Sequence, residues 1–131
     1  RSMNPAAACF QQASAEMAML CEWLGGLKET AYGLAGLGDL FVTVNAGRNS
    51  RLGLELGSGL RVSEAMAGSM SGETVEGVDT GARLAVGLNA AFAAGDLVRS
   101  GFPLTCALMA SIVDDVPFEI PTEAFWPDRN G

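Results

Sequence analysis

One glycine-rich stretch holds the residues whose types and spacing could do chemistry. Between residues 33 and 49 the chain reads GLAGLGDLFVTVNAGRN, with an acid, a threonine and an Arg-Asn pair among apolar residues. If the segment is helical, Asp39 and Thr43 lie one turn apart and project from the same face. A glycine inside a helix costs about 1 kcal/mol relative to alanine, so a run of them indicates that another helix, a ligand or a neighbouring domain approaches the backbone.

The turn that follows offers a site for an anion. Gly47 falls where a tight turn is needed, and Arg48 and Asn49 begin the next helix. The helix macrodipole disfavours a positive charge at a helix start, and a bound anion would reverse that penalty. Backbone amides, a guanidinium and a side-chain amide together suit a phosphate or a carboxylate. A plainer interpretation remains open, in which Asp39 is a solvated acid and Arg48 an ordinary surface cation.

The composition excludes several classes of function. The 131 residues are 49% hydrophobic with a mean hydropathy of +0.26, which is typical of one globular domain and not of a membrane span. The sequence contains no histidine, which excludes Ser-His and Cys-His hydrolases, and we expect no metal site. A net charge of −7 disfavours nucleic acid and anionic membranes as partners. Three cysteines without CxxC spacing favour the cytoplasm.

Helical signals begin near the first residues of the chain. Asn4 and Pro5 are typical of an N-cap and a first helical position, and the helical pattern continues until Gly25 and Gly26 end it. The apolar residues of this helix recur at three- and four-residue steps, so we expect them to form one buried face: Cys9, Ala13, Met17, Leu20 and Leu24.

Helical signals continue along the rest of the chain, and no segment alternates with period two. The expected elements are a short piece over 28–32, a helix over 33–44, an amphipathic helix ending at Gly57 or Gly59, a short helix capped by Ser63, a long alanine-rich helix ended by Gly95 and Asp96, a helix with Thr105 in its first turn, and a short frayed helix in the tail after Asp115. The sequence therefore predicts an all-α fold with a single domain over residues 1–131.

Four motifs follow one another in the order of a known family. GLAGLGDLFVT, GRNSRLG, TVEGV and PLT resemble the C-terminal, substrate-binding domain of NAD(P)-dependent glycerol-3-phosphate dehydrogenase, and the resemblance runs from about residue 4 to residue 112. It implies a helical domain of the type found in 6-phosphogluconate and glycerol-3-phosphate dehydrogenases. It further implies a pocket for dihydroxyacetone phosphate or glycerol 3-phosphate, lined by Asp39, Thr43, Gly47, Arg48 and Asn49.

The resemblance also implies a role for each of these residues. Asp39 would orient the ammonium group of a catalytic lysine, and Arg48 with Asn49 would hold the substrate phosphate. Gly47 stands where many bacterial members of the family have serine. On the cofactor side, Arg48 and Glu76 of the VEG motif would lie near NAD or NADP.

The chain departs from the family in what precedes these motifs. Family members carry an N-terminal Rossmann domain and a catalytic lysine in a KN motif, and the only lysine here, Lys28, does not match that motif. We therefore expect the Rossmann domain of the same protein to be the partner and to bind most of the cofactor, and we expect this chain alone to be inactive. A homodimer is left open. Two alternatives remain: a helical association or regulatory module without catalysis, and the helical domain of a related 2-hydroxyacid dehydrogenase or ketopantoate reductase.

Overall fold

The protein is helical throughout the part that the computed structural model describes, which comprises residues 5–25, 47–121 and 123. The elements are α1 (Pro5–Trp23), α4 (Arg48–Gly57), α5 (Val62–Ala67), α6 (Glu76–Ala94), the 3-10 turn η2 (Arg99–Gly101) and α7 (Pro103–Val113). No strand occurs within these residues, and the prediction of an all-α fold is confirmed. The helices expected over 28–32 and 33–44 lie outside the described residues, as does the expected cap at residue 4.

Several helix ends lie where local signals placed them. Pro5 begins α1, as expected for a residue whose fixed φ suits the first turn, and Pro103 is the first residue of α7. Gly95 ends α6 with φ +80, and there the Gly95 amide donates to the Phe92 carbonyl and the Asp96 amide to the Ala91 carbonyl. Thr105 lies in the first turn of α7, and α4 ends at Gly57, both as predicted.

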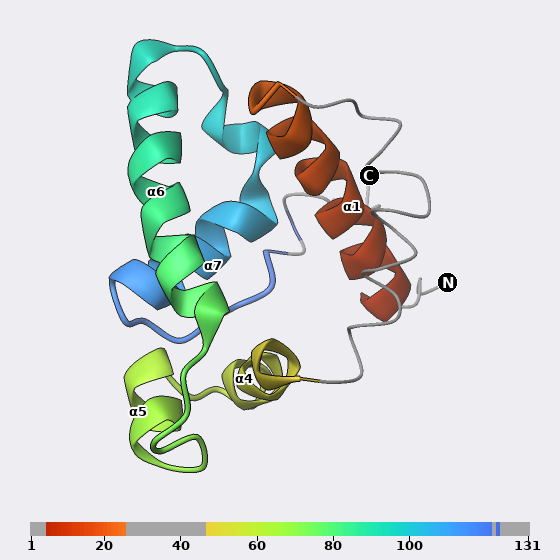
Figure 1. The fold of residues 1–131 in the computed structure, drawn as a ribbon. Coiled ribbons are helices and arrows are strands. Elements are labelled where there is room, and N and C mark those ends of the chain that lie inside the picture. The colour runs from red at the N-terminus through yellow and green to blue at the C-terminus, as the bar shows by residue number, and fades with distance from the viewer. Residues whose placement is uncertain (1–4, 26–46, 122, 124–131) are drawn as a thin grey trace.

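Three packed helices and a smaller pair make up the arrangement in Figure 1. Helices α6 and α7 lie side by side, α1 packs against α7, and α4 and α5 lie near the start of α6. One buried cluster joins α6, α7 and α1, with Ala85, Leu88 and Met109 at its centre. A second cluster joins α4, α5 and the segment up to the start of α6, and consists of Leu52, Leu56, Val62, Ala65, Met70 and Val75. Among the described residues, no helix has both the length and the apolar character needed to cross a bilayer.

The expected buried face of α1 is wrong. Leu24 follows the helix and is 71% exposed, and Cys9, Ala13, Met17 and Leu20 are only half-buried. The buried positions are instead Ala8, Ser14, Glu16 and Ala18. Glu16 is buried because α1 meets the beginning of α7, where its carboxylate accepts hydrogen bonds from the backbone amides of Leu104 and Thr105.

The expected cap at Ser63 is also wrong. Helix α5 begins at Val62 with Arg61 as its N-cap, and the Glu64 carboxylate accepts a hydrogen bond from the Arg61 amide at 3.1 Å. Ser63 lies inside the helix, where its amide donates to the Asp115 carboxylate at 3.0 Å and its hydroxyl donates to the other carboxylate oxygen. The acceptor for Ser63 therefore lies in the segment after α7, and no pattern near Ser63 in the sequence predicts this partner.

The expected helix in the tail does not begin directly after Asp115. Residues 116–121 are non-helical, and Pro117 and Pro121 have no amide hydrogen to donate within a helix. Residue 123 is helical, and the remainder of the tail lies outside the described residues.

The contact between Ser63 and Asp115 predicts a pH dependence of stability. Hydrogen bonds from the Ser63 hydroxyl and then the Ser63 amide hold the pKa of Asp115 below its usual value of 3.8. A lowered pKa in the folded state means that the contribution is present above the unfolded pKa and is lost as the pH falls through the folded pKa. Asp115→Asn should therefore be less stable than the parent at neutral pH, with the difference shrinking toward pH ~3.

Urea unfolding at a series of pH values checks this expectation. Asn tolerates the left-handed backbone that Asp115 adopts, with φ 52, so the substitution leaves the turn intact. Ser63→Ala is the matched variant from the other side of the contact. A difference between parent and Asp115→Asn that stays constant from pH 7 to pH 3 would contradict the expectation.

Two glycines of the α6 region should respond in opposite directions to alanine. A Cβ at Gly87 would meet Trp23 Cη2 at 3.5 Å, an ordinary contact, so Gly87→Ala should raise the free energy of unfolding by about 0.5–1 kcal/mol through helix propensity. Gly95 has φ +80, which an alanine adopts only with strain, so Gly95→Ala should lower the free energy of unfolding by about 1 kcal/mol. Urea unfolding measures both, and a shift of the same sign in the two variants would refute the expectation.

Candidate functional site

The turn before α4 has the geometry that the sequence predicted. Gly47 is the N-cap of α4 with φ +91 and ψ 172, a backbone conformation that side chains disfavour, and Arg48 is the first helical residue. Gly47 has no side chain that could cap this helix start. The Gly47 carbonyl accepts a hydrogen bond from the Arg51 amide at 3.1 Å. The start of α4 therefore places Arg48 at the positive end of the helix macrodipole.

Arg48 is exposed and makes no ion pair with any residue that the structure describes. Asn49 is the second residue of α4. Asp39 and Thr43 both fall within 26–46, outside the described residues, so their predicted positions beside Arg48 stay predictions. Of the sequence-predicted set, the described part of the chain brings Gly47, Arg48 and Asn49 together in one helix start.

Glu76 begins α6 as Arg48 begins α4. It is the first helical residue, it is exposed, and its N-cap Val75 is buried in the cluster that also contains Leu52 of α4. Arg51 Nη1 lies 2.7 Å from Glu73 Oε1, which ties the first turn of α4 to the turn before α6. The two helix starts that carry Arg48 and Glu76 are therefore joined by an ion pair and a shared core.

Sequence reasoning missed Glu16, whose side chain is 2% exposed. Its carboxylate accepts hydrogen bonds from the amides of Leu104 at 3.0 Å and Thr105 at 2.8 Å, and from Gln12 Nε2 at 3.1 Å. A carboxylate at a helix N-terminus is favoured by the unpaired amides and by the macrodipole. One signal could have revealed it: α7 starts after Phe102, which has no side-chain acceptor, so the amides of α7 need an acid from elsewhere.

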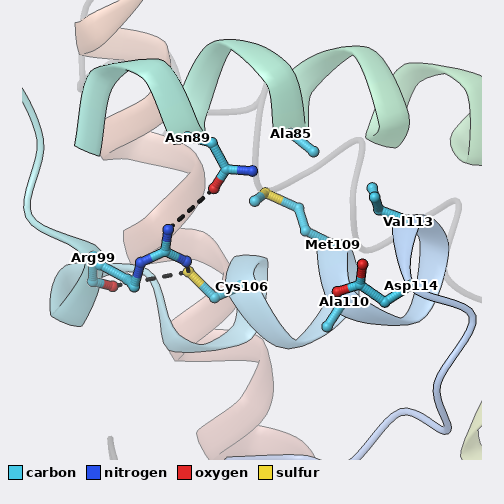
Figure 2. A pocket seen from close by; sticks show the side chains of 8 residues that line it. All are labelled: Ala85, Asn89, Arg99, Cys106, Met109, Ala110, Val113 and Asp114. Atoms are coloured by element: carbon cyan, nitrogen blue, oxygen red, sulfur yellow. Dashed lines mark hydrogen bonds between the residues drawn. The ribbon is translucent and has the colours of Figure 1, made fainter. Parts of the chain in front are cut away.

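A cavity of about 140 Å³ lies between α6, η2 and α7, and Figure 2 shows the side chains around it. Arg99 reaches over it from η2, donates from Nη2 to Asn89 Oδ1 at 3.1 Å and stacks on the Phe92 ring at 4.7 Å. Burial raises the pKa of the Cys106 thiol, which makes a reactive thiolate at neutral pH unfavourable. None of the sequence-predicted site residues lines this cavity.

No group of three acids and cysteines suited to a metal ion occurs in the described ranges. The candidate site is instead a pair of helix starts with exposed charged residues, and the fold defines the chain as an all-helical domain. Residues 1–119 match the family described as the C-terminus of NAD-dependent glycerol-3-phosphate dehydrogenase, and the chain belongs to this family.

Curated relatives are similar to the chain over part of their length. A glycerol-3-phosphate dehydrogenase (NAD(P)+) of Nitrosomonas europaea is 34% identical over 119 residues, which cover 89% of this chain and 33% of the relative. An NADP(+)-dependent glycerol-3-phosphate dehydrogenase of Archaeoglobus fulgidus is 59% identical over 51 residues, covering 39% and 15%. A Synechococcus enzyme with the same name as the Nitrosomonas one is 44% identical over 79 residues, covering 59% and 26%.

The chain thus spans a third or less of the length of these relatives. No solved structure gives a significant match to it. The comparisons agree with the family that the four motifs indicated.

Proposed function

We propose that the complete protein interconverts dihydroxyacetone phosphate and glycerol 3-phosphate with NAD or NADP, and that this chain is its substrate-binding part. The family of the chain and the names of its relatives support the proposal. The observation that carries it furthest is the start of α4, where Gly47 with φ +91 precedes an exposed Arg48 at the positive end of the helix macrodipole. Such a helix start favours a phosphate.

Arg48 and Asn49 hold the phosphate of the substrate in this proposal. A guanidinium can donate two parallel hydrogen bonds to phosphate oxygens, and the macrodipole of α4 adds to the attraction. The phosphate is remote from the reacting carbon, so its binding energy serves to orient the carbonyl for reaction. Thr43 and Gly47 complete the wall of the pocket.

Asp39 orients the proton donor. Reduction of the ketone needs a proton for the developing alkoxide, and a lysine ammonium supplies it when a carboxylate directs it toward the oxygen. That lysine belongs to the part of the protein outside this chain, as does the Rossmann domain. The nicotinamide supplies the hydride when bound, and Glu76 at the start of α6 lies on its side of the pocket.

A comparison of the complete protein with residues 1–131 tests the proposal. The complete protein should oxidise NADH or NADPH when given dihydroxyacetone phosphate, and much more slowly with dihydroxyacetone, which lacks the phosphate. Residues 1–131 alone should show no turnover, because the nucleotide-binding domain and the lysine are not among them.

Two outcomes would contradict the proposal. Turnover by residues 1–131 alone would show that the chemistry does not depend on a second domain. A folded complete protein that binds neither the cofactor nor the phosphorylated ketone would favour the association module over the dehydrogenase.

A further inference from the structure

The ion pair between Arg51 and Glu73 joins the two helix starts of the candidate site. Arg51 Nη1 lies 2.7 Å from Glu73 Oε1, across 22 residues of sequence. Arg51 is one helical turn after Arg48 on α4, and Glu73 is three residues before Glu76 on α6. The contact therefore joins α4, which carries the proposed phosphate ligand, to the turn before α6, which leads into the proposed cofactor-side acid Glu76.

Both ends of this ion pair are fixed by buried neighbours. Leu52 follows Arg51 and Val75 lies two residues after Glu73, and both belong to the same buried cluster. The Glu73 amide donates to the carbonyl of Met70 at 3.1 Å, and Met70 is buried in that cluster as well. The backbone on each side is therefore held in place, and the ion pair sets only how the first turn of α4 is aligned with the turn before α6.

The ion pair between Arg51 and Glu73 stabilises the fold too little to explain why Glu73 is held in this position. The side chains of Arg51 and Glu73 are 51% and 31% exposed, and an ion pair at that exposure contributes little to stability. The second oxygen of Glu73, Oε2, is shut off from solvent and has no hydrogen-bond partner among the described residues. A carboxylate oxygen without water or donor is destabilising. Stability alone therefore does not explain an acid at position 73 whose Oε2 is buried without a hydrogen-bond partner.

We propose that Glu73 is a positioning residue, which holds Arg51 by the ion pair and thereby aligns the start of α4, with Arg48, against the start of α6. The inference rests on the proposed function. Among the described residues, Arg51 is a second cation near this helix start, since residues three apart on a helix are neighbours. Because Arg51 pairs with Glu73, Arg48 is the arginine that binds the substrate phosphate.

Steady-state kinetics of the complete protein with dihydroxyacetone phosphate test this role, using Glu73→Ala, Arg51→Ala and the double variant. Each single variant should raise KM about two- to fivefold, the range that an ion pair of this exposure supports, while kcat changes less than twofold. The double variant should be no worse than the worse single one, because both remove the same contact. Glu73→Gln, which keeps an oxygen for Arg51, should lie closer to the parent.

Asp79→Ala is the matched control, because it removes an exposed acid from the first turn of α6, close to Glu73 in sequence, without breaking this ion pair. It should leave KM near that of the parent. A merely structural role would lower the stability of the variants to urea and leave KM unchanged, which would overturn the inference. A lower KM in Glu73→Ala would also overturn it, since a released Arg51 would then bind the phosphate directly. If the parent itself does not turn over the substrate, the proposed function fails first, and the inference with it.

Discussion

Glu16→Ala is expected to lower the free energy of unfolding by about 3 kcal/mol, because two backbone donors lose the carboxylate that they bond. The buried carboxylate accepts hydrogen bonds from the amides of Leu104 and Thr105, and its removal takes this acceptor from both donors, of which the Leu104 amide is buried. Urea unfolding followed by circular dichroism measures the loss.

Two further variants control this experiment. Gln11→Ala changes an exposed side chain on the same helix and should have an effect within ~0.5 kcal/mol. Glu16→Gln keeps the size and one acceptor oxygen, but it turns an amide group toward one of the donors, so it should fall between the parent and Glu16→Ala. The role of Glu16 as the cap of α7 would be refuted if Glu16→Ala were no less stable than Gln11→Ala.

Arg48→Ala should lower kcat/KM of the complete protein for dihydroxyacetone phosphate by roughly 10- to 150-fold. The proposed contact is charge-assisted and worth roughly 1.5–3 kcal/mol, and the rate follows from the transition-state relation. With dihydroxyacetone the loss should be much smaller, because the group that Arg48 binds is missing. Steady-state kinetics with both substrates measure the difference.

Asp39→Asn is the matched comparison for Arg48→Ala. It keeps the size of the side chain and weakens the orientation of the lysine, so its effect should fall on kcat and persist with dihydroxyacetone. If Arg48→Ala lost the same factor with and without the phosphate, Arg48 would be a structural residue and the proposed site would be wrong.

The candidate site could be predicted from the sequence only in its local parts. Gly47 and Arg48 were placed correctly at a turn and a helix start, because a positive φ and a helix boundary depend on a few neighbouring residues. The ion pair of Arg51 with Glu73 could not be predicted, because its members are 22 residues apart and many acids could have met that arginine. The roles of Asp39 and Thr43 stay predictions from the resemblance to the family.

The sequence by itself determined the helical class, the family and most of the helix boundaries. Pro5, Pro103 and Gly95 act through their own φ angles or their own missing amide, so their effect is visible without knowledge of the fold. Only the tertiary structure decided that Glu16 is buried as the cap of α7 and that Ser63 bonds to Asp115. The physical reason is distance along the chain: these partners are 88 and 52 residues apart, and only packing of the helices brings them within hydrogen-bond reach.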